Sequence, residues 1–337
     1  MRVWIDLANS PHVPLVAPIV RALDERGDTV LLTAREHAQT LPLARKLWPD
    51  VQVVGGPSPA GRVGKAAAIA GRARELRRLR RRLRPDVALS HGSYAQILAC
   101  SGARVGVVTM MDYEYQPANH VSFRLADRIL VPNVFPDAAL RRFGARPSKV
   151  VRYDGFKEEL YLSGFRADDS VATELGLDTS KVIVVFRPPP DGALYHRLEN
   201  TRFDEVFDDA TGRPDVQVVV LPRTDVQRER YANRALVPAQ AVDGSALLAL
   251  TDLVVGGGGT MTREAALLGT PTYTVFAGAL AAVDQALIDR GLLADLRDPS
   301  TVPRFVKKSP DHGTATHGPV LLQKVLDVLD ETAHRPN

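Results

Sequence analysis

Short apolar runs alternate with amphipathic stretches along the first half of the chain. Six runs have the length and the flanking turn residues of strands, and the stretches between them carry apolar residues at helical spacing. The expected strands are Val3–Leu7, Thr29–Thr33, Val51–Val54, Asp86–Ser90, Val105–Thr109 and Arg128–Val131. The expected helices are Pro14–Arg26, Arg35–Leu47, Lys65–Arg84, Tyr94–Ser101 and Val121–Ala126. Strands separated by helices predict βαβ units and a parallel sheet.

The alternation restarts in the second half and predicts a second parallel sheet. Its expected strands are Lys181–Phe186, Val216–Leu221, Leu253–Val255 and Thr272–Phe276. Its expected helices are Phe203–Thr211, Asp225–Asn233, Ser245–Leu250, Met261–Leu268 and Val283–Arg290. We therefore predict an α/β chain of two Rossmann-like domains, with a last helix that returns to the first domain. The expected boundaries are 1–152 for the first domain, 153–168 for a connector, 169–316 for the second domain and 317–337 for the terminal helix.

Composition narrows the class of protein. A chain of 337 residues with 45% apolar and 24% charged residues is typical of a soluble enzyme with two domains. It contains no run of 18 apolar residues and begins directly with a strand, so we expect a cytoplasmic protein. The single cysteine, Cys100, has apolar neighbours and is expected to be buried and unreactive.

Positive charge is concentrated in one helix. The net charge is only +4, but the segment Arg72–Arg84 contains eight arginines and one glutamate. Leu76, Leu79 and Leu83 form an apolar seam opposite a dense cationic face. This face is either an ordinary solvated surface, a peripheral contact with anionic lipid at the inner face of a membrane, or a contact with an acidic partner. Nucleic acid is not expected, because no aromatic residues are interleaved for base stacking.

The segment VVGGGGTMTREAALLGTP joins an apolar strand to a helix that is expected to start near Thr260. Glycines let a ligand approach the backbone, and a helix start offers unpaired amides at the positive end of its dipole. This corner is therefore expected to bind an anionic group such as phosphate through Gly257, Gly258, Gly259 and Thr260. Glu264, one turn later, is expected to accept hydrogen bonds from sugar hydroxyls. The alternative is a tight turn in which Glu264 only complements the dipole.

Two arginines stand at the ends of other strands in the second half. Arg187 follows the strand Lys181–Phe186, and Arg223 follows the strand Val216–Leu221. Ligands of open parallel sheets bind at the carboxyl ends of the strands. We therefore expect both guanidinium groups to contact a diphosphate near the glycine-rich helix start. Surface ion pairs are the alternative for either arginine.

Polar side chains also follow three strands of the first half. They are Asn9, Ser10 and His12 after the first strand, His91 after the fourth, and Asp112 and Glu114 after the fifth. Because histidine and partly buried carboxylates serve as general bases, the candidate catalytic residues are His12, Asp112 and Glu114. The candidate substrate contacts are Asn9, Ser10 and His91. A packing histidine, helix caps and structural carboxylates are the alternatives.

Several well-defined chemical motifs do not occur in the sequence. It contains no GxGxxG, Walker A, GxSxG or HExxH sequence, no paired CxxC, and no Asp-x-Asp pair. The sequence therefore gives no support to a dinucleotide fingerprint, a hydrolase elbow or a metal-bridged phosphate site, and no metal or cofactor is expected.

Longer motifs give the chain a family resemblance. WIDLANSPHV at the start, TAREHAQT, YDGFKEELYL and GGGGTMTREAALLGTP together span nearly the whole chain. With these motifs the chain resembles the GT-B superfamily, and most closely a bacterial and archaeal family of predicted glycosyltransferases of unknown function. The resemblance implies two Rossmann-like domains that face each other across a cleft. It does not specify a reaction.

The lipid-II-forming N-acetylglucosaminyltransferase is one GT-B protein to which the chain is similar. There, a similar glycine-rich loop precedes a glutamate that holds the nucleotide ribose, and Glu264 occupies the matching place. Its first loop is glycine-rich and ends in His-x-x-Pro; His12 matches the histidine, but this chain lacks the glycines. TMMDYEYQPAN resembles its acceptor-side loop, with Asp112 and Glu114 only approximately aligned.

Non-hydrolysing UDP-N-acetylglucosamine 2-epimerases are the second comparison. Their second domain opens with a strand that ends in His-Arg-Arg-Glu-Asn, whereas this chain has Phe-Arg-Pro-Pro around Arg187. The arginine is matched and the histidine is missing, which argues against epimerase chemistry. The segment DGSALLALTD resembles the nucleobase-covering segment of both groups, which implies base contacts by Asp243, Gly244 and Ser245.

Residues and resemblance together favour a metal-independent glycosyltransferase of cell-envelope or surface glycan synthesis. It would use a nucleotide-diphosphate sugar, with UDP as the nucleotide, and a glycan or lipid-linked acceptor. Arg187 and Arg223 would stabilise the leaving diphosphate, and a base from the first domain would deprotonate the acceptor. The alternatives are an isomerase similar to UDP-N-acetylhexosamine 2-epimerases and a non-catalytic sugar-nucleotide-binding protein.

Overall fold

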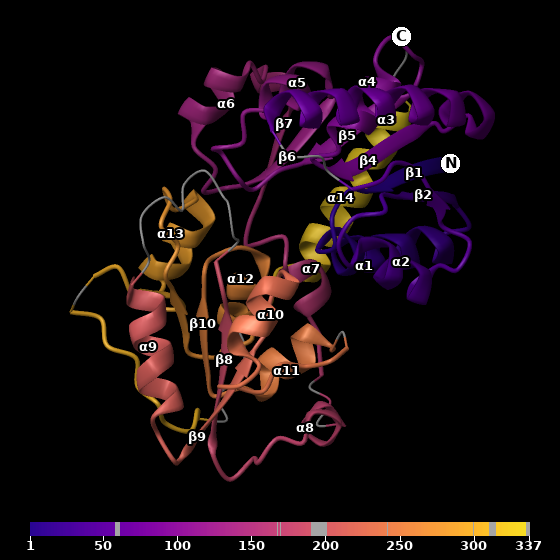
Figure 1. The fold of residues 1–337 in the computed structure, drawn as a ribbon. Helices are drawn as coiled ribbons and strands as arrows, with labels where there is room; N and C mark the ends of the chain where they lie inside the picture. The colour runs from indigo at the N-terminus through magenta and orange to yellow at the C-terminus, as the bar shows by residue number, and fades with distance from the viewer. Residues whose placement is uncertain are drawn as a thin grey trace. The chain divides into compact units, whose positions relative to one another are not determined.

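The chain folds into two compact units, each built on one parallel sheet (Figure 1). The computed structural model describes residues 1–57, 61–166, 168, 170–189, 201–240, 242–298, 300–309 and 315–334. Unit 1 comprises Met1–Tyr161 together with His317–Asn337, and unit 2 comprises Leu162–Thr316. Unit 1 is therefore assembled from both ends of the sequence.

Unit 1 contains a seven-stranded sheet in the order β3-β2-β1-β4-β5-β6-β7, with every neighbouring pair parallel. Its strands are β1 (Arg2–Leu7), β2 (Thr29–Ala34), β3 (Gln52–Val53), β4 (Val87–His91), β5 (Gly106–Met110), β6 (Arg128–Pro132) and β7 (Val150–Tyr153). Its helices are α1 (His12–Glu25), α2 (Thr40–Leu47), α3 (Arg62–Leu83), α4 (Tyr94–Cys100), α5 (Asn119–Leu125), α6 (Asp137–Phe143), the 3-10 turn η1 (Pro147–Lys149) and α14 (Gly318–Ala333). Helix α7 (Glu159–Leu162) ends at the unit boundary.

Helices cover both faces of this sheet, which is why its strands are nearly continuous apolar runs. Because side chains alternate along a strand, Val3 and Ile5 of β1 pack with α1, α2 and α14, whereas Trp4 packs with α3, α4, α5 and α6. Cys100, at the end of α4, is buried, and burial raises the pKa of its thiol to about 12. The expectation of a buried, unreactive cysteine is confirmed.

Helix α14 (yellow in Figure 1) completes the core of unit 1. Its apolar face contributes Leu321, Val325 and Leu329 to the same cluster as β1 and α1. At Gly106, the start of β5, a Cβ atom would lie 2.7 Å from the carbonyl oxygen of Thr332. Only glycine therefore allows the last turn of α14 to lie this close to the sheet.

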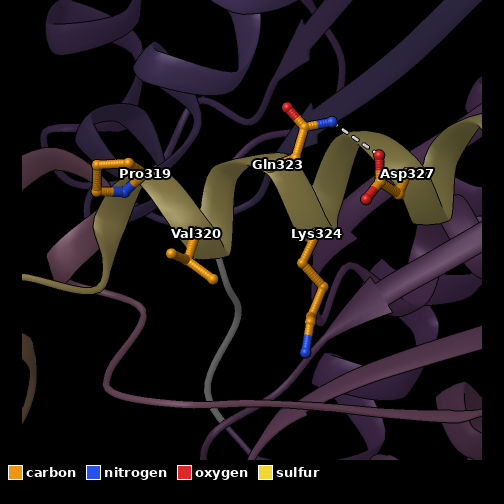
Figure 2. A pocket seen from close by; sticks show the side chains of 5 residues that line it. All are labelled: Pro319, Val320, Gln323, Lys324 and Asp327. Carbon is orange, nitrogen blue, oxygen red and sulfur yellow. Dashed lines mark hydrogen bonds between the residues drawn. The ribbon is translucent and has the colours of Figure 1, made fainter.

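The exposed side of α14 borders a hollow of about 450 Å³ (Figure 2). The residues that line it are Pro319, Val320, Gln323, Lys324 and Asp327. Gln323 donates a hydrogen bond to Asp327 over 2.8 Å, and Lys324 donates to the carbonyl of Arg152 over 3.0 Å. None of the candidate site residues lines this hollow.

Unit 2 contains a five-stranded parallel sheet in the order β12-β11-β10-β8-β9. Its strands are β8 (Val182–Arg187), β9 (Val216–Val220), β10 (Leu253–Gly256), β11 (Thr272–Thr274) and β12 (Ala294–Asp295). Its helices are α8 (Ser170–Leu175), α9 (Thr201–Thr211), α10 (Asp225–Tyr231), α11 (Gly244–Leu250), α12 (Thr260–Leu267) and α13 (Ala282–Asp289). Phe203 and Phe207 of α9 pack edge-on against Phe186 on one face, and Leu247 of α11 packs with Val185 and Ala265 on the other.

The predicted α/β class and all ten expected strands are confirmed, with shifts of a few residues at their ends. The elements that the sequence analysis did not predict are β7, α6, the two-residue edge strand β12, the 3-10 turn η1 and the short helices α7 and α8. Strand β7 lies at the sheet edge, where most of its side chains are only half-buried, so it lacks a strong apolar signal. The prediction for α2 was wrong at its start, because the helix begins at Thr40 rather than Arg35.

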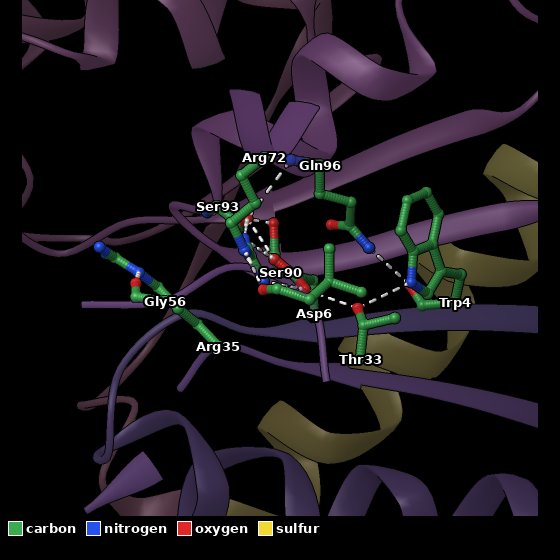
Figure 3. A network of polar contacts seen from close by, with 10 residues as sticks. Trp4, Asp6, Thr33, Arg35, Gly56, Arg72, Ser90, Ser93 and Gln96 are labelled. Atoms are coloured by element: carbon green, nitrogen blue, oxygen red, sulfur yellow. Dashed lines mark hydrogen bonds and ion pairs between the residues drawn. The ribbon is translucent and has the colours of Figure 1, made fainter. Parts of the chain in front are cut away.

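A buried ion pair holds β1 against α3 (Figure 3). The carboxylate of Asp6 accepts two hydrogen bonds from the Arg72 guanidinium, over 2.7 and 2.8 Å. It also accepts from Ser93, which caps α4, and from Thr33 of β2 over 2.5 Å, while Thr33 accepts from the Trp4 indole over 3.0 Å. Because every charge in this network has a partner, its burial is tolerated.

Because of this ion pair, the cationic face of α3 contains one arginine fewer than the sequence predicts. Arg72 points into the protein with only 7% exposure, so it does not belong to the surface of α3. Leu76 and Leu79 form the predicted apolar seam. The exposed arginines of α3 and its C-cap are Arg74, Arg77, Arg78, Arg81, Arg82 and Arg84, and none of them forms an ion pair with a described residue.

Replacing Arg72 by methionine is expected to lower the free energy of unfolding by about 3–5 kcal/mol, because the Asp6 carboxylate would remain buried without its counter-charge. Chemical denaturation measures this loss. Arg78→Met, at an exposed position on the same helix, should change stability by less than about 0.5 kcal/mol. Equal losses of stability in the two variants would show that the buried ion pair stabilises the fold no more than an exposed arginine does.

Candidate functional site

Candidate chemistry lies at the carboxyl ends of the strands in both units. In unit 2 it surrounds the turn between β10 and α12, where Gly256 ends the strand and Thr260 starts the helix. In unit 1 it follows β1, β4 and β5. Open parallel sheets place their ligands at these edges.

Two of the four consecutive glycines are explained by packing. A Cβ atom on Gly256 would lie 2.5 Å from the Thr262 hydroxyl, and one on Gly257 would lie 2.6 Å from Cα of Pro189. The Gly257 amide already donates to the carbonyl of Arg187 over 3.0 Å. The Gly257 amide is therefore already used at the edge of the sheet.

The next two glycines form the turn itself. Gly258 and Gly259 have φ of +82° and +95°, a region that side chains with a Cβ disfavour, and only Gly259 has open space where its Cβ would be. Among the described residues, the amides of Gly258, Gly259, Thr260 and Met261 have no backbone hydrogen-bond partner. These donors lie at the positive end of α12, which is the arrangement that binds an anion.

Arg187 and Arg223 bind the backbone of each other's loops. Arg187 donates to the carbonyls of Leu221 and Pro222 over 2.7 and 3.0 Å, and Arg223 donates to the carbonyl of Pro188 over 3.0 Å. These bonds hold the ends of β8 and β9 together. Burial, and then the positive charge of Arg223, lower the pKa of Arg187 to about 10, while Glu264 opposes the shift. An anion would relieve this repulsion between two neighbouring cations.

Glu264 and the start of α11 stand near the same corner. Glu264 lies in the second turn of α12 with 9% exposure, within electrostatic reach of Arg187. The side chain of Asp243 accepts from the Ala246 amide over 3.0 Å and so caps α11, which is a structural role that the sequence interpretation did not assign. Ser245 is half-buried in the first turn of that helix.

In unit 1, the structure brings His12, His91 and Asp112 together. The rings of His12 and His91 lie 5.1 Å apart, and His91 Nε2 is 3.2 Å from Asp112 Oδ1. Lys157 donates to Asp112 Oδ2 over 2.6 Å and also binds the carboxylate of Glu158. All except His91 are buried, and His91 keeps 13% of its side chain exposed. The cluster combines two imidazoles with a charged triad.

The other candidates of unit 1 belong to the same loops as this cluster. Asn9 is exposed, and its carbonyl accepts from the His12 amide over 3.0 Å. The hydroxyl of Ser10 lies 3.4 Å from that of Thr40. Glu114 is buried in the same loop as Asp112. Asn9 and Ser10 thus form the turn that starts α1.

Lys157 and Glu158 are the members of the cluster that sequence reasoning missed. They belong to the YDGFKEELYL motif, which was assigned to the interdomain connector. The sequence feature that could have revealed them is the run of one lysine and two glutamates in a segment without strand or helix periodicity. The third of these residues, Glu159, accepts from the His317 amide over 2.8 Å and so attaches α14 to this loop.

Within the described ranges, no group of three or more His, Cys, Asp or Glu side chains is placed to hold a metal ion. No helix in the part of the chain that the structure describes has the length and apolar character needed to cross a bilayer.

Comparisons with known proteins confirm the fold. A family model described as "Protein of unknown function (DUF354)" matches residues 1–307. An uncharacterised protein of Methanocaldococcus jannaschii is 28% identical over 312 residues, which is 90% of both chains. The UDP-N-acetylglucosamine 2-epimerase from Rickettsia bellii has a TM-score of 0.70 at 12% identity, over 99% of this chain and 97% of that one. The enzyme from Neisseria meningitidis, solved with bound UDP-GlcNAc, has a TM-score of 0.67 at 14% identity, over 97% and 100%. The expected GT-B fold is thereby confirmed.

His12 is expected to make stability depend on pH. Burial, and then the charges of His91 and Lys157, lower the pKa of His12 well below 6.5. The unfolded chain therefore takes up this proton at a higher pH than the folded chain, and stability falls as the pH drops below about 6.5. Between pH 6.5 and 5, His12 alone should contribute a slope approaching ~1.4 kcal/mol per pH unit. Denaturation of His12→Gln should show a flatter dependence, whereas His334→Gln, at an exposed site, should match the unchanged protein.

Proposed function

We propose that this chain, which belongs to the DUF354 family, is a glycosyltransferase that takes its sugar from a nucleotide-diphosphate donor, with UDP as the nucleotide. The observation that carries the proposal is the corner between β10 and α12. There the amides of Gly258 to Met261 lack backbone partners among the described residues, beside two arginines and a buried glutamate. A diphosphate linked to a ribose has the charge and the hydroxyls that such a corner can bind.

Each group of unit 2 has a part in this proposal. The amides at the start of α12 would bind the diphosphate oxygens, and Glu264 would accept hydrogen bonds from the ribose hydroxyls. Arg187 and Arg223 would stabilise the negative charge that develops on the leaving diphosphate. Their backbone bonds hold both guanidinium groups in place before the donor arrives, so little ordering is required. Ser245 and Asp243 are the proposed contacts of the base.

Unit 1 would supply the acceptor side of the reaction. An acceptor hydroxyl attacks the anomeric carbon only as its proton is removed, and His12, His91, Asp112 and Glu114 are the candidates for that proton transfer. The acceptor that we propose is a glycan or a lipid-linked glycan of the cell envelope or surface. A solvent-protected site would favour this acceptor over water.

A second candidate function is the epimerisation of a UDP-N-acetylhexosamine. Two observations favour it: the two solved structures of similar fold described above are UDP-N-acetylglucosamine 2-epimerases, and the carboxylates of Asp112 and Glu158 share Lys157 in a buried cluster. Against it, the residue before Arg187 is Phe186, which is fully buried and offers no polar atom. An isomerase would need no acceptor.

Incubation with UDP-N-acetylglucosamine, followed by nuclear magnetic resonance of the products, tests the proposal against these alternatives. Transfer predicts free UDP and a slow release of sugar when water is the only acceptor. Epimerisation predicts a new sugar nucleotide with no loss of UDP linkage. Tight binding without either product would identify a non-catalytic binding protein.

Glu264→Ala is expected to weaken UDP binding by about 1–3 kcal/mol, the cost of losing hydrogen bonds to a charged acceptor. Isothermal titration calorimetry measures the difference. Glu229→Ala, which removes an exposed carboxylate on α10, is the matched control and should leave the affinity unchanged. Unchanged affinity in Glu264→Ala would remove this residue from the nucleotide site.

The exposed arginines of α3 support a further part of the proposal, a peripheral contact with the inner face of a membrane. Anionic headgroups attract clustered guanidinium groups with about 1 kcal/mol for each arginine near the surface. The first turns of α3 add apolar surface, since Val63 is 85% exposed. Anionic lipid on the cytoplasmic leaflet would bring the enzyme to a lipid-linked acceptor.

Neutralising Arg77, Arg78, Arg81 and Arg82 together with glutamine is expected to weaken binding to phosphatidylglycerol vesicles more than about 100-fold at low salt. Vesicle co-sedimentation measures this loss, and salt should weaken the unchanged protein in the same way. Arg141→Gln with Arg142→Gln, exposed arginines of α6, form the control. If neither salt nor the fourfold substitution weakens vesicle binding, the arginines of α3 form an ordinary solvated surface.

A further inference from the structure

We propose that His91 is the residue that takes up the acceptor proton, that Asp112 orients its ring, and that Lys157 positions Asp112. This inference rests on the proposed function, in which an acceptor hydroxyl must lose a proton. It gives the base role to His91, which the sequence offered only as a substrate contact, and it adds Lys157 of the YDGFKEELYL motif.

Asp112 is already fully engaged. One carboxylate oxygen faces His91 Nε2 at 3.2 Å, and the other accepts from Lys157 Nζ over 2.6 Å. Lys157 also binds Glu158, so its ammonium group lies between two carboxylates and is only 5% exposed. A carboxylate held on both sides is a poor base for an incoming hydroxyl, but it fixes the direction of the imidazole. Asp112 therefore acts through His91.

His12 is unsuited to be the base although it is next to His91. Its ring is buried, and burial lowers its pKa well below 6.5, so it holds a proton poorly. The Nδ1 atom of His12 is buried and has no hydrogen-bond partner among the described residues. His91, at the end of β4, retains contact with solvent through 13% of its side chain. Of the two imidazoles, His91 is the one that an acceptor can reach.

His91 Nε2 lies 3.2 Å from Asp112 Oδ1 without forming a hydrogen bond in this structure, and a proton on Nε2 would be attracted to this carboxylate, which leaves Nδ1 as the base. The proton of the acceptor hydroxyl passes to Nδ1, while the acceptor oxygen forms a bond to the anomeric carbon of the sugar. The bond between that carbon and the diphosphate oxygen breaks, and its electron pair leaves with the diphosphate. The Asp112 carboxylate then stabilises the imidazolium.

The charge of Lys157 provides a readout that does not depend on turnover. The charged and titratable groups around the pair of imidazoles, His12 and His91, are Arg72 of α3, Asp112 after β5, and Lys157 and Glu158 before α7. Removing the lysine charge in Lys157→Met leaves Asp112 more negative toward His91, so the pKa of His91 should rise by about one unit. Lys157→Arg keeps the positive charge, so His91 in this variant should titrate as it does in the unchanged protein. The exposed His334 serves as the internal reference.

Histidine-resolved nuclear magnetic resonance titration of the full chain measures this shift, and thermal denaturation confirms that each variant is folded. The acidic limb of the pH profile for UDP release from UDP-N-acetylglucosamine should move to higher pH in Lys157→Met by the same amount. His91→Gln should lower kcat at least about 100-fold, the range for loss of a general base.

Three results would overturn the proposal in distinguishable ways. A His91 pKa that is the same in Lys157→Met and in the unchanged protein would remove Lys157 and Asp112 as positioning residues. UDP release that survives His91→Gln would overturn the base role alone. Absence of turnover in the unchanged protein would overturn the base role together with the proposed function, while the titration would still report the coupling of His91 to Lys157.

Discussion

The buried pair between Asp6 and Arg72 determines how the carboxyl edge of the first sheet is organised. Strand order reverses between β1 and β4, and at this point the ion pair joins the end of β1 to α3 and to the cap of α4. His12 follows β1 and His91 ends β4, so the network fixes the two backbones that bring these rings within 5.1 Å. The Arg72 charge also contributes to the lowered pKa of His12. A structural ion pair and a reactive cluster thus share one electrostatic environment.

At the carboxyl edge of the second sheet, main-chain groups rather than a buried ion pair organise the site that we propose. Its four glycines have two structural roles. Gly256 and Gly257 leave space for Thr262 and Pro189, and Gly258 and Gly259 form the turn before α12. Arg187 and Arg223 are bound to carbonyl groups, so their positions depend on the strand ends. The donor corner that we propose is therefore built largely from main-chain atoms. Substitutions of side chains should perturb such a corner less than substitutions of its glycines.

Most of the fold was predictable because the central strands are buried on both faces and read as apolar runs. The strands that escaped prediction, β7 and β12, are short edge elements that are only partly buried, so their sequences carry little periodic signal. The site was only partly predictable. Position after a strand correctly grouped His12, His91 and Asp112, since strand ends meet at one edge. Lys157 and Glu158 were not predicted as site residues because their position depends on the loop after β7. The capping of α11 by Asp243 and the hydrogen bond of the Gly257 amide were not predicted because both depend on the folded structure.

Unit 1 is discontinuous in sequence, so its core is complete only when segments from both sides of unit 2 in the sequence meet. Leu321, Val325 and Leu329 of α14 belong to the same apolar cluster as β1 and α1, and the end of α14 lies against Gly106. Helices α1 and α2 cover the same face of the sheet, and α14 completes that cover. The contacts of α14 join residues separated by the whole sequence of unit 2, and such long-range contacts form slowly during folding.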